Sequence, residues 1–243
     1  MNISAETLLM LAVAGLYLYD SAQLLYCNEA VLIPAGKRDW KAGFGSANFS
    51  VLGRELYVPN LLLIHRPLFR LSWSFERSGG PSEPWEPAHG AFLPLAPLVW
   101  NIAIALFVLL PLGFFTYLGD FALLPALLLL YANMLLALGW IWFHRRNFQL
   151  SGKGFASLAF ECLICPPFAL NLVRRVGLGM PVREDLVSAA RRLQREADWA
   201  QTRDRLIARL ANEIESEDPK SKRYALLQAR RRVLVDEGES CPA

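Results

Sequence analysis

The stretch FALLPALLLLYANMLLALGWIWF, residues 121–143, decides the fold class of this chain. It contains no charged residue, and a helix needs about 20 consecutive apolar residues to cross a bilayer. We therefore predict a transmembrane helix here. Only Gly119 and Asp120 separate it from a second apolar stretch at 91–118, so we expect an antiparallel hairpin of two spanning helices. Pro111 and Pro125 are expected to bend these helices near the turn.

A third spanning helix is predicted at 3–26, where no Lys or Arg precedes the apolar run and no small-residue cleavage site follows it. A fourth apolar stretch at 155–173 contains Glu161 and is interrupted by Pro166 and Pro167. A re-entrant or interfacial helix–break–helix is favoured there over a fourth span. The sequence thus predicts an all-α membrane protein with three transmembrane helices plus this re-entrant or fourth segment.

Composition agrees with membrane association. Hydrophobic residues make up 54% of the chain and charged residues 19%, against typical soluble values of about 45–50% and about 25%. The charges are concentrated after Arg174, which predicts a membrane domain at 1–176 and a cytoplasmic helical tail at 177–243. The net charge of +3 is too small to indicate a nucleic-acid partner.

The distribution of Lys and Arg predicts the orientation, because cytoplasmic loops are enriched in these residues. They lie between the first two predicted spans and directly after the third, at Lys37, Arg38, Lys41, Arg54, Arg66, Arg70, Arg77, Arg145, Arg146 and Lys153. The expected location is a bacterial inner membrane, with the N-terminus outside and both the 28–90 loop and the tail in the cytoplasm.

The 28–90 loop is too long to be a simple connector. Two β-type runs flank Gly53–Arg54 within residues 49–58, which predicts a small β-hairpin. The apolar and basic segment at 61–73 is expected to lie in the lipid headgroup layer. Residues 79–87 are rich in Pro and Gly and predict an irregular lead-in to the next span.

The tail is predicted to form a helical hairpin. Residues 182–216 contain no Gly or Pro, and apolar residues recur at spacings of three and four, with Asp204 in the one missing position. The resulting heptad seam, a candidate surface for a protein partner or a second copy, contains Leu186, Ala190, Leu193, Ala197, Ala200, Ile207, Ala211 and Ile214. A second helix at 220–235 places Tyr224, Leu227 and Leu234 on one face.

Several polar residues lie within or beside the apolar runs, namely Asp20, Asn28, Glu29, Asn101, Asn133 and Glu161. Such groups are functional candidates because burying them is costly. Asn101 and Asn133 are expected to hydrogen-bond between the paired helices. Glu161 requires a cationic partner, for which Arg174, Arg145 and His144 are candidates.

The predicted topology collects basic, histidine and carboxylate side chains at the cytoplasmic headgroup level. A lipid phosphate could be held there by arginine forks with a proton donor nearby. The candidate residues are His65, Arg66, Arg70, His144, Arg145, Glu161 and Arg174. The alternative is that these arginines follow the positive-inside rule and form no site.

Cys162 and Cys165 form a C-x-x-C pair, which can be a redox dithiol or half of a metal site. No second ligand pair is present in the sequence, so packing inside the protein is favoured and neither a metal nor a cofactor is expected. Phosphate-loop, nucleophile-elbow and zinc-protease motifs are also absent from the sequence.

These features favour a non-enzymatic accessory or scaffold protein that binds a partner, or itself, through its helical tail. One alternative is a membrane-embedded enzyme or binder of a phosphate-bearing lipid at the cytoplasmic interface. Another is a subunit of a transporter complex with Asp20 and Glu161 along a polar path. The expected partners are membrane lipids together with a protein partner or a second copy of the chain.

Overall fold

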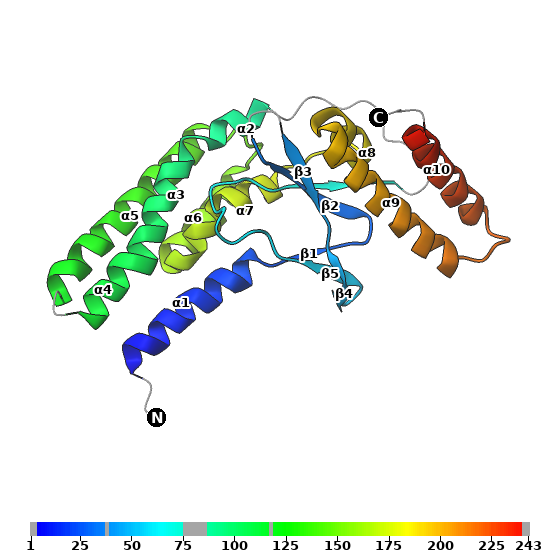
Figure 1. Cartoon of the computed structure of the whole chain (residues 1–243). Coiled ribbons are helices and arrows are strands. Elements are labelled where there is room, and N and C mark those ends of the chain that lie inside the picture. The colour runs from blue at the N-terminus through cyan, green and yellow to red at the C-terminus, as the bar shows by residue number, and fades with distance from the viewer. Residues whose placement is uncertain (1–3, 37–38, 75–86, 117–118, 240–243) are drawn as a thin grey trace. The chain divides into compact units, whose positions relative to one another are not determined.

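The computed structural model describes residues 4–36, 39–74, 87–116 and 119–239 (Figure 1). The chain divides into two compact units, each assembled from segments far apart in the sequence. The first unit comprises Met1–Gln23, Val58–Leu68 and Pro84–Pro181, and the second comprises Leu24–Tyr57, Phe69–Glu83 and Val182–Ala243. Three of the sequence features lie wholly or mostly outside the described residues: Lys37 and Arg38, Arg77, and the lead-in at 79–87.

The predicted helical hairpin dominates the first unit. One arm consists of α2 (Pro87–Phe92), α3 (Leu95–Ile104), the π-helical segment η1 (Ala105–Leu109) and α4 (Leu110–Phe115), and the other arm is α5 (Gly119–Phe143). Asn101 Nδ2 donates to Asn133 Oδ1 at 3.1 Å, which confirms the hydrogen bond expected between the arms. In η1 the Leu110 N–H bonds to the Ala105 carbonyl, five residues back, immediately before Pro111. Such a π turn beside a proline is a common origin of helix irregularity.

The prediction of three spans plus a fourth apolar segment in an all-α fold is wrong. In the described part of the chain, two helices are long and apolar enough to cross a membrane, His89–Phe115 with 27 residues and Phe121–Phe143 with 23. The first apolar run forms only the 17-residue helix α1 (Ala5–Ser21). At 1.5 Å per residue it is about 26 Å long, less than the ~30 Å hydrocarbon core. The fold also contains two antiparallel three-stranded sheets.

The fourth apolar stretch is broken where the two prolines occur. It forms α6 (Gly152–Ile164), the 3₁₀ segment η2 (Pro166–Asn171) and α7 (Leu172–Gly179). Ser151 caps α6 by accepting a hydrogen bond from the Gly154 N–H. Pro166 and Pro167 cannot donate the backbone hydrogen bonds that would continue α6, so the chain changes direction there. At 13 residues α6 is too short to span a bilayer.

The two sheets belong mainly to the second unit. One sheet has the strand order β3-β2-β6, from β3 (Trp40–Gly43), β2 (Glu29–Pro34) and β6 (Phe69–Ser72); the other has the order β1-β5-β4, from β1 (Gln23–Leu25), β5 (Arg54–Tyr57) and β4 (Ser46–Val51). The side chains of Phe69 and Leu71 in β6 and of Trp73 directly after it are all buried. The end of the segment predicted to lie in the headgroup layer therefore contributes to the core of a sheet.

Strands β4 and β5 form the small hairpin expected around Gly53. The turn is Leu52–Gly53, one residue earlier than predicted, because Val51 pairs with Arg54. Both turn residues have positive φ, 52° at Leu52 and 74° at Gly53. This conformation is typical of the two-residue turn whose twist matches that of paired strands.

Three helices complete the second unit, α8 (Leu186–Leu193), α9 (Glu196–Ser216) and α10 (Lys222–Glu239). The single helix predicted over 182–216 is wrong, because Gln194 and Arg195 adopt extended backbone conformations between α8 and α9. Helices α8 and α9 pack on β3, and α10 packs on α9 with Leu227 and Leu234 buried. Within this unit the tail is thus part of a folded body rather than a free arm.

Candidate functional site

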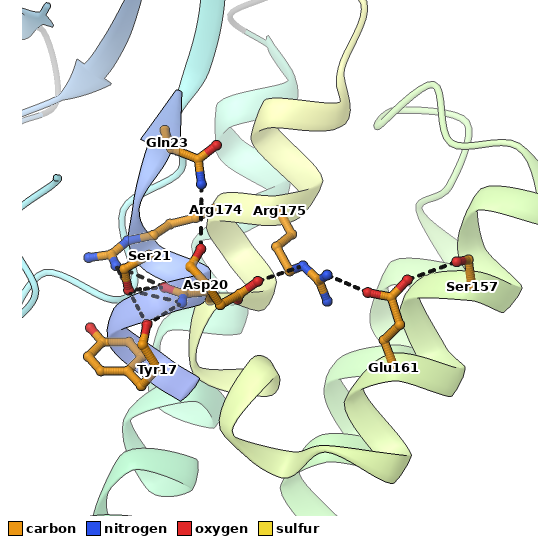
Figure 2. Close-up of polar contacts among 9 residues, drawn as sticks. Tyr17, Asp20, Ser21, Gln23, Ser157, Glu161, Arg174 and Arg175 are labelled. Atoms are coloured by element: carbon orange, nitrogen blue, oxygen red, sulfur yellow. Dashed lines mark hydrogen bonds and ion pairs between the residues drawn. The ribbon is translucent and has the colours of Figure 1, made fainter. Parts of the chain in front are cut away.

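A chain of ion pairs connects three helices of the first unit (Figure 2). Arg175, on α7, lies between two carboxylates, with its Nε 3.4 Å from Asp20 Oδ1 at the end of α1 and its Nη2 bonded to Glu161 on α6. Glu161 also accepts a hydrogen bond of 2.9 Å from the hydroxyl of Ser157, one turn earlier on α6. We call Asp20, Glu161 and Arg175 the polar cluster.

The neighbouring Arg174 supports this cluster from inside the protein. It is 2% exposed, and its guanidinium donates to Asn171 Oδ1 at 2.8 Å and to the Asn60 carbonyl at 2.6 Å. Asn171 in turn donates to the Ser21 hydroxyl at 3.0 Å. Successive helical residues project about 100° apart, so α7 directs Arg174 into this buried network and Arg175 toward the carboxylates.

The environment shifts the acidity of the two carboxyl groups in opposite directions. Burial raises the pKa of Asp20, and the Arg175 charge opposes that shift. Hydrogen bonds from Ser157 and Arg175 lower the pKa of Glu161, which is more exposed. Asn171 also acts on Asp20 through a side-chain hydrogen bond, which opposes the effect of burial. The side chains of Arg175 and Glu161 are 25% and 37% exposed, so the cluster presents a donor group and an acceptor group to a further polar group.

An apolar groove of about 530 Å³ begins one helical turn from the polar cluster. Its walls come from α1, the η1–α4 segment, α5 and the α6–η2 junction, and include Leu9, Val13, Leu16, Leu127, Cys165 and Pro166. Leu16 is four residues before Asp20 on α1, and Cys165 is four residues after Glu161. Burial raises the pKa of the Cys165 thiol, and the charges of Asp20 and Arg175 also act on it. The groove and the cluster thus adjoin at the α6–η2 junction.

The groove has the size of a site for a small ligand, since such pockets are about 300–1,000 Å³. Its wall is almost entirely apolar, and the carboxyl groups of Asp20 and Glu161 each lie one helical turn from a residue of the wall. This arrangement suits an amphipathic molecule, with an apolar part along the groove and a polar part at the cluster.

The residues predicted to bind a lipid phosphate are found in several separate places. His65 accepts a hydrogen bond of 3.3 Å from Trp100 Nε1, and burial together with the charges of Arg66 and Arg174 lowers its pKa. His144 stacks on Trp140 with ring centroids 3.9 Å apart.

The other predicted residues have different neighbours again. Arg145 lies over the ring of Trp142, 4.2 Å from its centroid. Arg70 belongs to strand β6 in the second unit. Glu161 pairs with Arg175, which was not among its predicted partners Arg174, Arg145 and His144. Of these predicted residues, Glu161 belongs to the polar cluster and Arg174 lies next to it.

Sequence reasoning placed Arg174 and Arg175 together at the headgroup level but missed Arg175 as the partner of Asp20 and Glu161. In the sequence, Arg174 and Arg175 form one basic pair, and their helical phase depends on where the chain resumes after Pro166–Pro167. The usable signal was Asn171, because a polar residue three positions before Arg174 in an apolar run indicates a buried hydrogen-bond partner.

The predicted heptad seam does not coincide with the buried face of α9. Among the seam residues, Leu186 is buried, Ala197 is exposed, and Leu193, Ala200, Ile207 and Ile214 are half-buried. The buried residues of α9 are Trp199, Thr202, Leu206 and Leu210. The break at Gln194–Arg195 resets the helical phase, so the continuous seam read across it is divided between two helices.

The cysteine pair consists of free thiols. Cys162 is fully buried, and burial raises its pKa to about 12, so little of the reactive thiolate form exists near neutral pH. Within the ranges that the structure describes, no group of three or more His, Cys, Asp or Glu side chains is placed to hold a metal ion.

The buried carboxyl group of Asp20 predicts a pH effect on stability. The group is neutral in both states below its unfolded pKa of 3.8. As the pH rises through the raised pKa of the folded state, folding must hold a buried carboxylate, so the stability contribution falls. Relative to Asp20→Asn, the wild-type protein should lose thermal stability as the pH rises from below 3.8 and then level off. A constant or rising difference in melting temperature between the two proteins would contradict this.

Comparison with known proteins identifies no relative of this chain. The chain matches no protein-family model, and searches of curated proteins and of solved structures return no match.

Proposed function

We propose that this chain is a membrane-associated protein that binds a lipid-like amphiphile. The apolar part of the ligand would occupy the groove, and a zwitterionic head would meet the polar cluster. The observation that supports this most directly is the combination of an apolar groove of about 530 Å³ with the partly exposed ion pair of Arg175 and Glu161, since Glu161 lies one helical turn from Cys165 of the groove wall. An amphiphile supplies both parts, because its chain avoids water and its head carries charge.

The membrane association rests on the two helices that are long enough to cross a bilayer. Their most apolar windows are only 28% and 33% buried inside the protein. A core helix of a water-soluble protein would bury most of that surface, and a bilayer would cover it instead. We further propose an inner membrane, with the Arg145–Arg146 end of α5 on the cytoplasmic side, because Lys and Arg accumulate there.

The nature of the head group follows from the charges of the cluster. Arg175 already shares its positive charge with two carboxylates, which disfavours a purely anionic ligand. A phosphoethanolamine-type head would offer a phosphate oxygen to the guanidinium of Arg175 and an ammonium donor to the carboxylate of Glu161, both of which are partly exposed. A choline head has the same net charge but no N–H donor, so it is a matched comparison.

Binding can be tested by native mass spectrometry of the delipidated protein in a mild detergent. Lysophosphatidylethanolamine and lysophosphatidylcholine are the probes. We expect one molecule of the ethanolamine lipid to be retained preferentially. Equal retention of both lipids would refute the head-group assignment, and an absence of saturable retention would refute the site.

A tryptophan at position 12 should block the groove. Ala12 lines the groove, and Ala12→Trp places a large ring in the space for the ligand chain. We expect retention of lysophosphatidylethanolamine to fall at least about tenfold, which corresponds to roughly 1.4 kcal/mol. Leu11→Trp is the matched control, because Leu11 is an exposed neighbour that does not line the groove. Equal retention by both variants would contradict the proposal.

A second candidate function, an accessory or scaffold protein, is favoured by the outer surface of α10. Leu226 is 42% exposed and Val233 is 48% exposed on this otherwise charged helix, and both could contact a protein partner. The test is Leu226→Glu with Val233→Glu, followed by purification from membranes. Loss of a stoichiometric partner would support this role, and unchanged co-purification would exclude this surface.

A further inference from the structure

The tip of the β4–β5 hairpin exposes an unusual amount of apolar surface. Phe49, Val51 and Leu52 are 66%, 53% and 97% exposed, and every residue from 48 to 53 is exposed. Single exposed apolar residues are ordinary on protein surfaces, but three large ones within four positions form a patch. Such a patch indicates a surface that is covered by something else in the working protein.

The backbone at the tip makes the presence of leucine informative. Leu52 has a φ of 52°, a conformation that favours Gly, Asn or Asp and disfavours residues with larger side chains. Its side chain gains nothing from burial within the protein, since it is almost fully exposed. A strained position occupied by an exposed leucine suggests that the side chain has a role outside the fold.

Two amphipathic side chains, Arg54 and Tyr26, follow the apolar residues of the tip. Arg54 lies over the ring of Tyr26, 4.5 Å from its centroid, and donates a hydrogen bond to the Tyr26 hydroxyl. Tyr and Arg are residues that favour the boundary between acyl chains and headgroups. The next residue, Glu55, is paired with Arg209, so its negative charge is neutralised within the protein.

We infer that this hairpin tip inserts into the interfacial layer of a lipid bilayer. The apolar side chains of Phe49, Val51 and Leu52 would enter the acyl region, while Arg54 and Tyr26 would contact headgroups, with Arg54 favouring anionic lipids. A two-residue turn is a convex tip that needs no shaped pocket in its partner. The chain also contains helices suited to the bilayer, and such a tether keeps the hairpin at a high effective concentration near lipid.

Site-specific photo-crosslinking of the full-length protein in its own membranes tests this inference. Leu52 is replaced by the photoreactive residue benzoylphenylalanine, and adducts are identified by mass spectrometry. The same residue at Leu128, in the candidate span Phe121–Phe143, is the positive control, and at exposed Asp204 on α9 it is the negative control. We expect lipid adducts at positions 52 and 128, with at least about tenfold less at position 204.

Three results would overturn the inference. These are a protein adduct without lipid at position 52, no adduct there while position 128 is labelled, and equal lipid labelling at positions 52 and 204. A second probe at Phe49 guards against a local disturbance of the turn, and it should give the same result as Leu52. Because the amphiphile groove is not involved, Ala12→Trp should leave the adducts at position 52 unchanged.

Discussion

Gly177→Ala is expected to destabilise the first unit by about 1–3 kcal/mol, the usual effect of overpacking a close contact. A Cβ atom at position 177 would lie 2.7 Å from the Leu68 carbonyl oxygen and 3.0 Å from the Leu68 nitrogen. Both are backbone atoms, so neither can rotate away. Helix α7 would have to move from the 58–68 segment, and Arg174 and Arg175 would move with it.

Gly179→Ala is the matched control on the same helix. A Cβ atom there meets nothing within 4 Å, and alanine has the higher helix propensity, so the change should be neutral or slightly stabilising. Thermal unfolding in detergent and hydrogen exchange of α7 provide the measurements. Equal stability of the two variants would show that α7 does not approach the Leu68 backbone closely.

Arg209→Ala is expected to destabilise the second unit by about 3–5 kcal/mol, the effect of breaking a buried ion pair. Arg209, on α9, pairs with Glu55 and donates to the Cys27 carbonyl at 2.7 Å and to the Gly45 carbonyl at 3.0 Å. The side chains of Arg209 and Glu55 are only 14% and 16% exposed. Removing the guanidinium leaves a largely buried carboxylate and two carbonyl groups without this donor.

Arg205→Ala on the same helix is the control for Arg209, since Arg205 is exposed and its guanidinium carbon lies a long 5.9 Å from the centroid of the Phe44 ring. We expect a loss below about 1 kcal/mol there. Hydrogen exchange in β4, β5 and α9 is the appropriate measurement, because unfolding of a protein with two units need not be two-state. Glu55→Gln should recover part of the loss in the Arg209→Ala background, as it removes the unpaired charge.

Truncation of the tail would disturb the fold of the second unit. Residues 182–243 supply α8, α9 and α10, which pack on the strands of the second unit and on each other. Deleting them would expose the buried side chains of β2 and β3, so loss of a partner after truncation would be ambiguous. Point substitutions on the exposed face of α10 avoid this difficulty.

The sequence by itself determined the features that depend on local pattern. Spanning helices predicted at 91–118 and 121–143 correspond to candidate spans at His89–Phe115 and Phe121–Phe143, because uncharged apolar runs of that length have few alternatives. The Asn101–Asn133 bond followed from two polar residues facing each other in a tight hairpin. The β4–β5 hairpin and the break at Pro166 followed from the backbone preferences of glycine and proline.

The tertiary structure decided everything that depends on where separate segments meet. The run predicted as a first span at 3–26 divides into a short helix and strand β1. The strand forms because Gln23–Leu25 pairs with β5 (Arg54–Tyr57), which is distant in the sequence. The helical phase of the tail and the choice of Arg175 as partner of Glu161 depend on breaks at Gln194–Arg195 and Pro166–Pro167. The polar cluster joins α1, α6 and α7 across more than a hundred residues, and its attraction acts through space rather than along the chain.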